Sequence, residues 1–419
     1  MASFFGLLKG EMLNGNAGVH SLKKSNLSIL DSILLCLLGC AIFFPSSLGG
    51  DFNKLALERF VFLMSVLVLF GFRFFRLSGV AFLLFSSIAI FYLMFSIIYE
   101  GSDYAFGHAL SLLPVMTLLL LRPYRSVSLS LVLSLYYVTV ILVFVVGYVG
   151  FVFSEVAFLQ TSLYSGGYSG LSERFLGSFV PVSIFTSHSY AGFFYFIFVF
   201  VSSLLFYHGY SRLFNLLVVL VSLTSLLALK SGSSYFFFIY SCIFLVYFIV
   251  FLAPNRYTLI FLKIFLLACL VFVLVFFYLH YASGFISRII GDSGNGLLSR
   301  YGGGVLKPSL DYIYERPLVG IGFGYSESFY YTDSDYVVVA LRLGIMGASL
   351  YFLYFFLFLY SSMRAFLGAS CFCFLVGAVS AFMISMPVST YYRTVPVLLL
   401  LVLLFEAINK NARIGHVKR

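Results

Sequence analysis

The sequence predicts an all-α integral membrane protein, a polytopic transmembrane helical bundle of about twelve spans with two long loops on its non-cytoplasmic side. Three observations predict this fold. Hydrophobic residues make up 62% of the 419 residues and charged residues only 10%, which is too little polar surface for a soluble globular chain. The apolar residues form runs of about 20, the length that crosses a hydrocarbon core of ~30 Å. These runs are apolar on every face, whereas the strands of a membrane barrel alternate.

The expected spans belong to one integral membrane domain that covers residues 1–419. The first span follows a polar tail with Lys23 and Lys24 and lacks a small-residue cleavage site, so we expect a retained helix rather than a signal peptide. All six cysteines fall inside apolar runs, where we expect them to pack as small apolar side chains. Hydropathy places the twelve spans at residues 28–48, 55–72, 77–99, 105–121, 127–151, 188–207, 213–229, 234–252, 258–279, 336–359, 366–387 and 394–408.

Lysine and arginine are distributed unequally between alternate connections, and this inequality predicts the orientation. One set of connections carries fifteen of them and the opposite set of short loops carries four, so the positive-inside rule places both termini in the cytoplasm. The net charge of +10 therefore indicates membrane topology, and we expect no nucleic-acid partner. The richer set is Lys9, Lys23, Lys24, Arg73, Arg76, Arg122, Arg125, Arg212, Arg256, Lys263, Arg364, Lys410, Arg413, Lys418 and Arg419, and the poorer set is Lys54, Arg59, Lys230 and Arg393.

Two connections on the non-cytoplasmic side are long, residues 152–187 and residues 280–335. Every other connection is a short turn, and long loops on a compact bundle are more often functional than decorative. Glycines are frequent in the second loop and indicate sharply turning backbone there. These two loops are where we expect the functional site.

The second loop is predicted to contain a short amphipathic helix that lies along the membrane surface. Leu306, Leu310 and Ile313 recur at helical spacing. Pro308 stands near the start of this pattern and Pro317 ends it, as is typical of a short helix.

Arginine and carboxylate side chains gather in the two long loops. The guanidinium fork matches phosphate oxygens bidentately and stays charged at any pH, which suits a lipid diphosphate held at the bilayer surface. The alternative is that these residues are interface anchors and solvated loop charges. The candidate arginines are Arg174, Arg288, Arg300 and Arg316.

Arg342 is a further candidate because it falls inside the expected tenth span. A charge at that depth costs a few kcal/mol unless it is paired or faces water. Arg342 therefore either extends toward the outer headgroups or lines a polar cavity and meets a phosphate or a loop carboxylate.

The expected outer side also carries side chains that could accept a proton, Glu173, Asp333, Asp335 and His188. The Asp333-Ser-Asp335 triplet could hold a divalent metal, but it stands where a helix begins, so N-terminal capping is the commoner role. We therefore expect no metal and no cofactor. The glycines from Gly320 to Gly324 follow no βα pattern, which argues against a nucleotide-binding loop.

Several of these segments resemble a known family. Arg300-Tyr-Gly, then Leu310 through Arg316, then Pro317-Leu-Val-Gly-Ile-Gly-Phe-Gly324, resemble the second outer loop of bacterial O-antigen polymerases of the Wzy type and of the related O-antigen ligases. Thr332 to Tyr336, leading to Leu343-Gly-Ile-Met-Gly347, is similar to the start of the family's next helix, and Arg174-Phe-Leu-Gly-Ser-Phe179 is similar to its first-loop element. The specific motifs cover about fifty residues, and the two large outer loops match the family's layout.

The chain departs from the family at two places. Where many members have an SxSR motif, this chain has Ser231-Gly-Ser-Ser234, and only Lys230 stands near enough to replace the arginine. Ligases typically have a histidine within the second loop. This chain has none between residues 281 and 335, which favours a polymerase over a ligase.

The resemblance implies transfer of a glycan from one undecaprenyl diphosphate to a sugar hydroxyl on another at the periplasmic face of the bacterial inner membrane, without ATP. Preorganised arginines would stabilise the departing diphosphate. We assign this role first to Arg174, Arg300 and Arg342, then to Arg288 and Arg316. The implied partners are lipid-linked oligosaccharide donor and acceptor, the bilayer and a chain-length regulator. Lys230, Asp333 and Tyr301 are further expected substrate contacts, and the tyrosine could stack on a sugar ring.

Three other functions stay open. An O-antigen ligase would move the finished polymer onto lipid A-core. A lipid-linked oligosaccharide flippase or other transporter is a rival from a different class, but transporters usually place ionisable residues deep within several helices. A non-enzymatic partner of an assembly complex has no positive feature in its favour.

Overall fold

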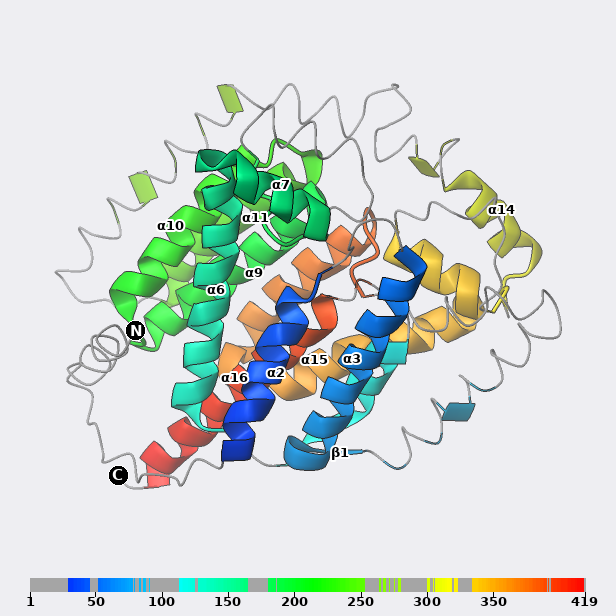
Figure 1. Cartoon of the computed structure of the whole chain (residues 1–419), viewed down its shortest axis with the longest axis horizontal. Helices are drawn as coiled ribbons and strands as arrows, with labels where there is room; N and C mark the ends of the chain where they lie inside the picture. The colour runs from blue at the N-terminus through cyan, green and yellow to red at the C-terminus, as the bar shows by residue number, and fades with distance from the viewer. Residues whose placement is uncertain are drawn as a thin grey trace.

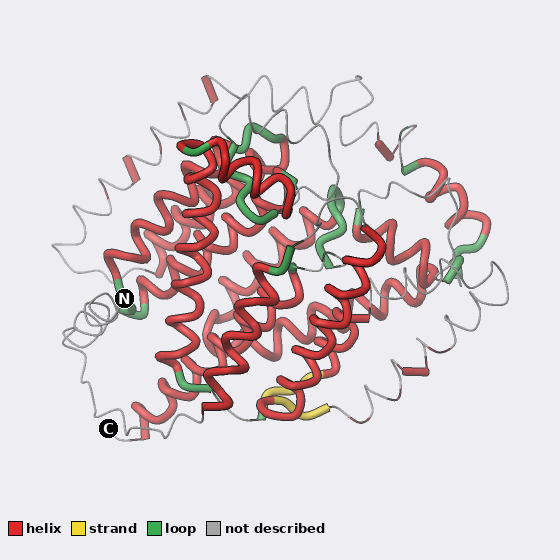
Figure 2. Tube along the Cα trace, viewed as in Figure 1, coloured by secondary structure: helices red, strands yellow, loops and turns green. Residues whose placement is uncertain are grey.

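The computed structural model of the chain is almost entirely helical over the residues that it describes, as the all-α prediction requires (Figure 2). Six of the described helical segments are long and apolar enough to cross a membrane, which indicates a multi-pass membrane protein. The count of twelve spans stays a prediction, because several expected spans fall on residues that the structure does not describe. The described residues are 29–45, 52–77, 113–124, 127–164, 180–185, 187–252, 306–318, 320–322, 334–389 and 393–417, with isolated residues between these ranges that include Arg300, Tyr301 and Tyr391.

The helices form one bundle, which Figure 1 shows with α9 and α16 among its inner helices and α7 and α14 at its upper edge. A short π-helix, η1 (Phe248–Leu252), continues α11, and two short strands pair after α3. In chain order the elements are α2 (Ile29–Phe43), α3 (Phe52–Phe74), β1 (Phe75–Leu77), β2 (Leu121–Pro123), α6 (Leu129–Val152), α7 (Ser154–Tyr164), α9 (His188–Tyr207), α10 (Arg212–Ala228), α11 (Gly232–Tyr247), η1, α14 (Lys307–Glu315), α15 (Asp335–Met383) and α16 (Thr394–Val417).

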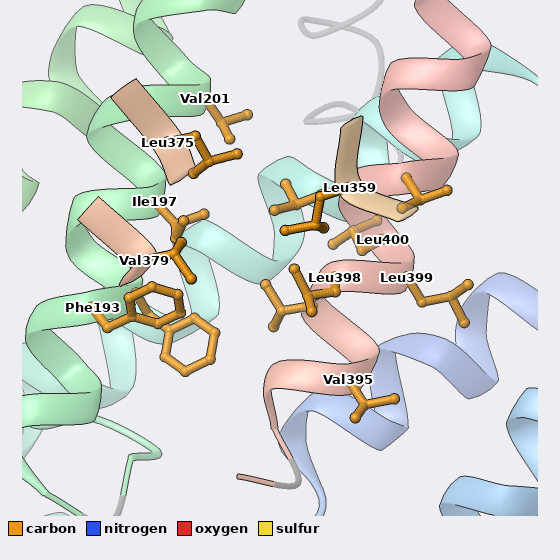
Figure 3. Packing of buried hydrophobic residues seen from close by; sticks show 14 of the residues in the cluster. Phe193, Ile197, Val201, Leu359, Leu375, Val379, Val395, Leu398, Leu399 and Leu400 are labelled. Carbon is orange, nitrogen blue, oxygen red and sulfur yellow. The ribbon is translucent and has the colours of Figure 1, made fainter. Parts of the chain in front are cut away.

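Helix α9 lies at the centre of the bundle and is buried on all sides along most of its length. It is apolar all round, as a helix enclosed by other helices must be. Phe193, Ile197 and Val201 of α9 face Leu375 and Val379 of α15 across the core (Figure 3). The large aromatic rings interlock here, and Phe193 stacks on Phe382 with ring centroids 5.5 Å apart.

The strands β1 and β2 form a small antiparallel ladder that the sequence analysis did not predict. Phe75 pairs with Pro123, Arg76 with Arg122 and Leu77 with Leu121. The ladder brings the end of the second expected span and the end of the fourth together at one end of the bundle. This agrees with a chain that crosses the membrane twice, through spans three and four, between these two ends.

Helix α15 is interrupted at two glycines and so consists of three straight pieces, residues 335–343, 345–367 and 369–383. Gly344 has φ 66° and ψ 174°, and Gly368 has φ 67° and ψ 165°, both outside the helical region. The break at Gly368 corresponds to the turn expected between spans ten and eleven. The break at Gly344 was not expected, and it shapes the candidate site.

The two ends of the bundle are distinguished by the helices that begin there and by the residues that they carry. Helices α9, α11, α15 and α16 begin at one end, which we call the Asp335 end. The opposite end, which we call the Arg73 end, has Asp31 at the start of α2 paired with Arg73 of α3 at 2.9 Å. Arg76 and Arg122 also lie at the Arg73 end, on the β1–β2 ladder. These basic residues all come from the connections predicted to be cytoplasmic.

Candidate functional site

The segment that joins α15 to α16, residues 384–393, occupies the middle of the Asp335 end. It is tied to the start of α15 by Asp335, whose side chain is fully buried. One carboxylate oxygen of Asp335 accepts a hydrogen bond from the Ser389 backbone N–H at 2.6 Å, and the other accepts one from the Ser389 hydroxyl at 2.8 Å. A buried carboxylate needs such partners, and these two bonds use both of its oxygens.

Tyr301 ties the second long loop to the same segment. Its hydroxyl donates to the Ile384 carbonyl at 2.6 Å and lies 2.9 Å from the hydroxyl of Ser334. Ser334 is the N-cap of α15, and its hydroxyl also donates to the Met383 carbonyl at 3.2 Å. Burial raises the pKa of the Tyr301 phenol, so it remains a neutral donor. The Tyr301 hydroxyl therefore holds the loop and keeps Arg300 at the Asp335 end, and the stacking of its ring on a sugar stays a prediction.

Arg393 is the last residue of the segment and is completely buried. Its Nη1 donates to the Ile42 carbonyl at 2.7 Å and its Nη2 to the Phe44 carbonyl at 3.0 Å, at the end of α2. The Tyr164 ring of α7 lies 4.9 Å from the guanidinium carbon, and the Tyr164 hydroxyl donates to the Phe43 carbonyl at 2.9 Å. Together these groups satisfy carbonyls that a helix end leaves open.

The role of Arg393 was not predicted, because in the sequence it is only one of four basic residues in the short outer loops. The signal that could have identified it is an arginine directly before an apolar span. An arginine at that position can turn toward the carbonyl end of a neighbouring antiparallel helix.

In the part of the second loop where the sequence predicts an amphipathic surface helix, the structure has α14 (Lys307–Glu315), with a proline in its first turn. Its apolar side packs on the first piece of α15. Leu306 and Ile313 form a small buried cluster with Val337 and Leu341. The polar side of α14 is exposed, so this helix lies on the bundle with its apolar side inward.

The glycine-rich residues after α14 fit into the break of α15. The backbone N–H groups of Ile321 and Gly322 donate to the carbonyls of Leu341 and Arg342 at 2.8 and 2.9 Å, and the N–H of Ile345 donates to the Pro317 carbonyl at 2.7 Å. These bonds satisfy helix groups that the break at Gly344 leaves open.

Gly320 shows why a glycine is required in this contact. It has φ 69°, and a Cβ at this position would lie 2.5 Å from the Leu341 carbonyl oxygen and 2.6 Å from the Gly344 nitrogen. The motif therefore provides close backbone docking, in agreement with the sharply turning backbone that the sequence predicts.

His188 and Lys230 lie where α9 and α11 meet, also at the Asp335 end. His188 Nδ1 is 2.9 Å from the Leu229 carbonyl, just before Lys230, which has a left-handed backbone with φ 51°. Ser231 caps α11, and the Ser233 hydroxyl donates to the Ser189 hydroxyl at 2.7 Å. The junction of α9 and α11 also contacts the 384–393 segment, because Tyr190 stacks on Tyr391 with ring centroids 3.7 Å apart.

The other predicted site residues are less closely tied to the 384–393 segment or lie outside the described residues. Arg342 is partly buried on the first piece of α15, and its carbonyl accepts the bond from Gly322. Arg316 caps the end of α14, with its guanidinium 5.4 Å from the Tyr312 ring centroid. Glu173, Arg174, Arg288 and Asp333 lie outside the described residues, so their convergence with Arg300 stays a prediction.

Asp335 fits a structural role better than the expected role of proton acceptor. Both of its oxygens are engaged by Ser389 and its side chain has no exposed surface, so a sugar hydroxyl has no route to it in this arrangement. The N-cap of α15 is Ser334, the middle residue of the Asp333-Ser-Asp335 triplet, so the expected capping role falls on Ser334 and not on Asp335.

Within the described part of the chain, no group of three or more histidine, cysteine, aspartate and glutamate side chains is placed to hold a metal ion. No model of a known protein family matches the chain, and no curated protein matches it. The function therefore has to be inferred from the residues at the Asp335 end.

Proposed function

We propose that the chain is a glycosyltransferase of the O-antigen polymerase type, which moves an oligosaccharide from undecaprenyl diphosphate to a sugar hydroxyl of another lipid-linked repeat. The reaction would take place at the periplasmic face of the bacterial inner membrane, with both chain termini in the cytoplasm. The observation that carries the proposal is the anchoring of Arg300 beside the start of α15 through the bonds of Tyr301 to Ser334 and Ile384.

The electrostatics of the Asp335 end support an anionic substrate. Arg300, Arg342 and Lys230 belong to this end. A diphosphate that gains negative charge as it departs would be stabilised more than the bound substrate, which is the condition for catalysis.

In the proposed reaction the acceptor hydroxyl oxygen forms a bond to the anomeric carbon of the donor sugar, and the bond from that carbon to the diphosphate oxygen breaks. The hydroxyl proton passes to a base. Glu173, Asp333 and His188 remain candidates for this base once the buried Asp335 is set aside. A hydrogen bond from His188 Nδ1 to the Leu229 carbonyl would keep Nε2 in the form that accepts a proton. The activated sugar–diphosphate bond supplies the driving force, so neither ATP nor a metal is required.

The break in α15 could favour the transporter alternative, because discontinuous helices line the substrate sites of many transporters. In such sites the open helix ends face the transported ion or solute. Here the groups that the break exposes at Leu341, Arg342 and Ile345 are bonded to Ile321, Gly322 and Pro317. This use of the break favours a fixed outer site over alternating access.

The gel pattern of lipopolysaccharide from a strain that lacks this chain tests the proposal. We expect core capped by a single repeat, without the ladder of longer chains, because polymerisation alone would be lost. Core with no repeat at all would instead indicate a ligase or a flippase, and an unchanged ladder would reject all three functions.

A further inference from the structure

The β1–β2 ladder at the Arg73 end places two arginines directly opposite one another. Arg76 and Arg122 are partners in the antiparallel register. Side chains of directly opposed residues lie on the same face with Cβ atoms about 5 Å apart, and like charges there destabilise the pair. An anion that contacts both guanidinium groups would remove this repulsion.

The contacts of the two arginines do not supply that anion. Arg122 Nη2 donates to the Tyr354 hydroxyl at 2.7 Å, and its guanidinium carbon lies 5.4 Å from the Tyr354 ring centroid. Its Nη1 forms no hydrogen bond with any residue that the structure describes. Arg76 lies over the Tyr124 ring, 4.9 Å from the centroid. These partners are neutral and aromatic, so no carboxylate in the described part of the chain compensates either positive charge.

The neighbouring carboxylate is already engaged. Asp31 receives its hydrogen bond from Arg73 Nε at 2.9 Å. The ladder and Arg73, two residues before β1, therefore bring three arginines together with one aspartate, and the excess positive charge falls on Arg76 and Arg122.

An apolar face leads directly to these arginines. Val61, Val68, Leu69 and Phe72 are exposed along α3 at spacings of three, four and seven residues, with Phe72 84% exposed one turn before Arg76. Arg76 is itself exposed. A stripe of this kind that ends in paired cations matches a molecule with an acyl chain and a phosphate, and basic residues beside membrane helices are typical contacts of anionic lipid headgroups.

We propose that Arg76 and Arg122 bind the phosphate of an anionic glycerophospholipid in the leaflet at the Arg73 end, with an acyl chain along the exposed face of α3. Arginine suits this ligand because its fork pairs with two phosphate oxygens at once. The site is separate from the Asp335 end and does not depend on the function proposed for it.

Native mass spectrometry of the full chain in detergent tests the site, with phosphatidylglycerol, phosphatidylcholine and inorganic phosphate added separately. We expect one phosphatidylglycerol to bind at concentrations where phosphatidylcholine does not. Equal binding of the two lipids would overturn the proposal. Inorganic phosphate that binds as tightly as phosphatidylglycerol would also overturn it, because the site would then serve a soluble phosphate compound.

The variant Arg76→Gln tests the residue assignment, since Arg76 is exposed and its loss leaves the Arg122–Tyr354 bond in place. We expect binding of phosphatidylglycerol to weaken by about five-fold, the usual effect of one basic residue near an anionic lipid. The matched control is Arg212→Gln, which removes the same charge from an exposed position at the same end but away from the ladder. Equal weakening in both variants would show general charge attraction and contradict a site at Arg76 and Arg122.

Discussion

The carboxylate of Asp335 receives two hydrogen bonds from the single residue Ser389, which lies 54 residues further along the chain. These bonds join the start of α15 to the segment before α16. The same segment presents Tyr391 to Tyr190 and Arg393 to the end of α2. The Asp335 end is therefore held together by the 384–393 segment, and its stability should depend on a few buried polar contacts.

Removal of the Ser389 hydroxyl should destabilise the bundle. The variant Ser389→Ala keeps the backbone bond to Asp335 but leaves one buried carboxylate oxygen without its partner, so we expect a loss of about 1–3 kcal/mol in the free energy of unfolding. Denaturant unfolding in detergent measures it. The control Ser349→Ala removes an exposed hydroxyl that bonds only within α15, and it should change stability by less than about 0.5 kcal/mol. Equal stability of the two variants would contradict the stabilising role assigned to the contact between Asp335 and Ser389.

A methyl group at Gly320 should release the second loop from α15. Gly320→Ala combines an unfavourable positive φ with a Cβ 2.5 Å from the Leu341 carbonyl oxygen. The control Gly368→Ala has nearly the same φ, 67°, but nothing within 4 Å of the added carbon, so it should cost only about 1 kcal/mol from the backbone conformation. Limited proteolysis of residues 300–334 should be faster in Gly320→Ala alone. Equal rates of proteolysis in both variants would show that glycine is needed at position 320 for its backbone conformation and not for close docking.

Loss of the Arg393 guanidinium should destabilise the contact between α2 and α16. Arg393→Met keeps most of the side-chain volume but loses two charge-assisted hydrogen bonds to the α2 carbonyls, so we expect a cost of about 3 kcal/mol or more. Arg393→Lys should recover part of this loss. The control Arg212→Met removes an exposed arginine and should cost less than about 0.5 kcal/mol. Thermal unfolding that is unchanged in Arg393→Met would contradict the role assigned to this arginine.

The sequence was sufficient for the features that depend on apolar patterning. The all-α class, the apolar helices and α14 with Leu306 and Ile313 on its buried side follow from periodicity alone, because these side chains have to leave water. The break at Gly344 did not follow, since an isolated glycine is tolerated within helices and nothing nearby in the sequence marks Pro317 to Gly322 as the segment that fills it.

The candidate site was predictable only in its location. The described part of the second loop, with Tyr301 and α14, lies at the start of α15, but the sequence did not predict that Asp335 bonds to Ser389 or that the Tyr301 hydroxyl bonds to Ile384. These partners are 54 and 83 residues away in the chain. Sequence spacing carries no information about such contacts, so it could not show whether Asp335 is a buried structural residue or an exposed base.

The most direct test of the central claim uses the purified chain and a defined undecaprenyl-diphosphate-linked repeat in detergent. We expect the wild-type chain to form products of two and more repeats and to release undecaprenyl diphosphate, and we expect Arg300→Ala and Arg174→Ala to lose about 100-fold or more of this rate while they unfold at the wild-type temperature. Arg212→Ala, at the opposite end, should keep the full rate. A folded wild-type chain that forms no longer product, or an Arg300→Ala variant with normal activity, would contradict the account.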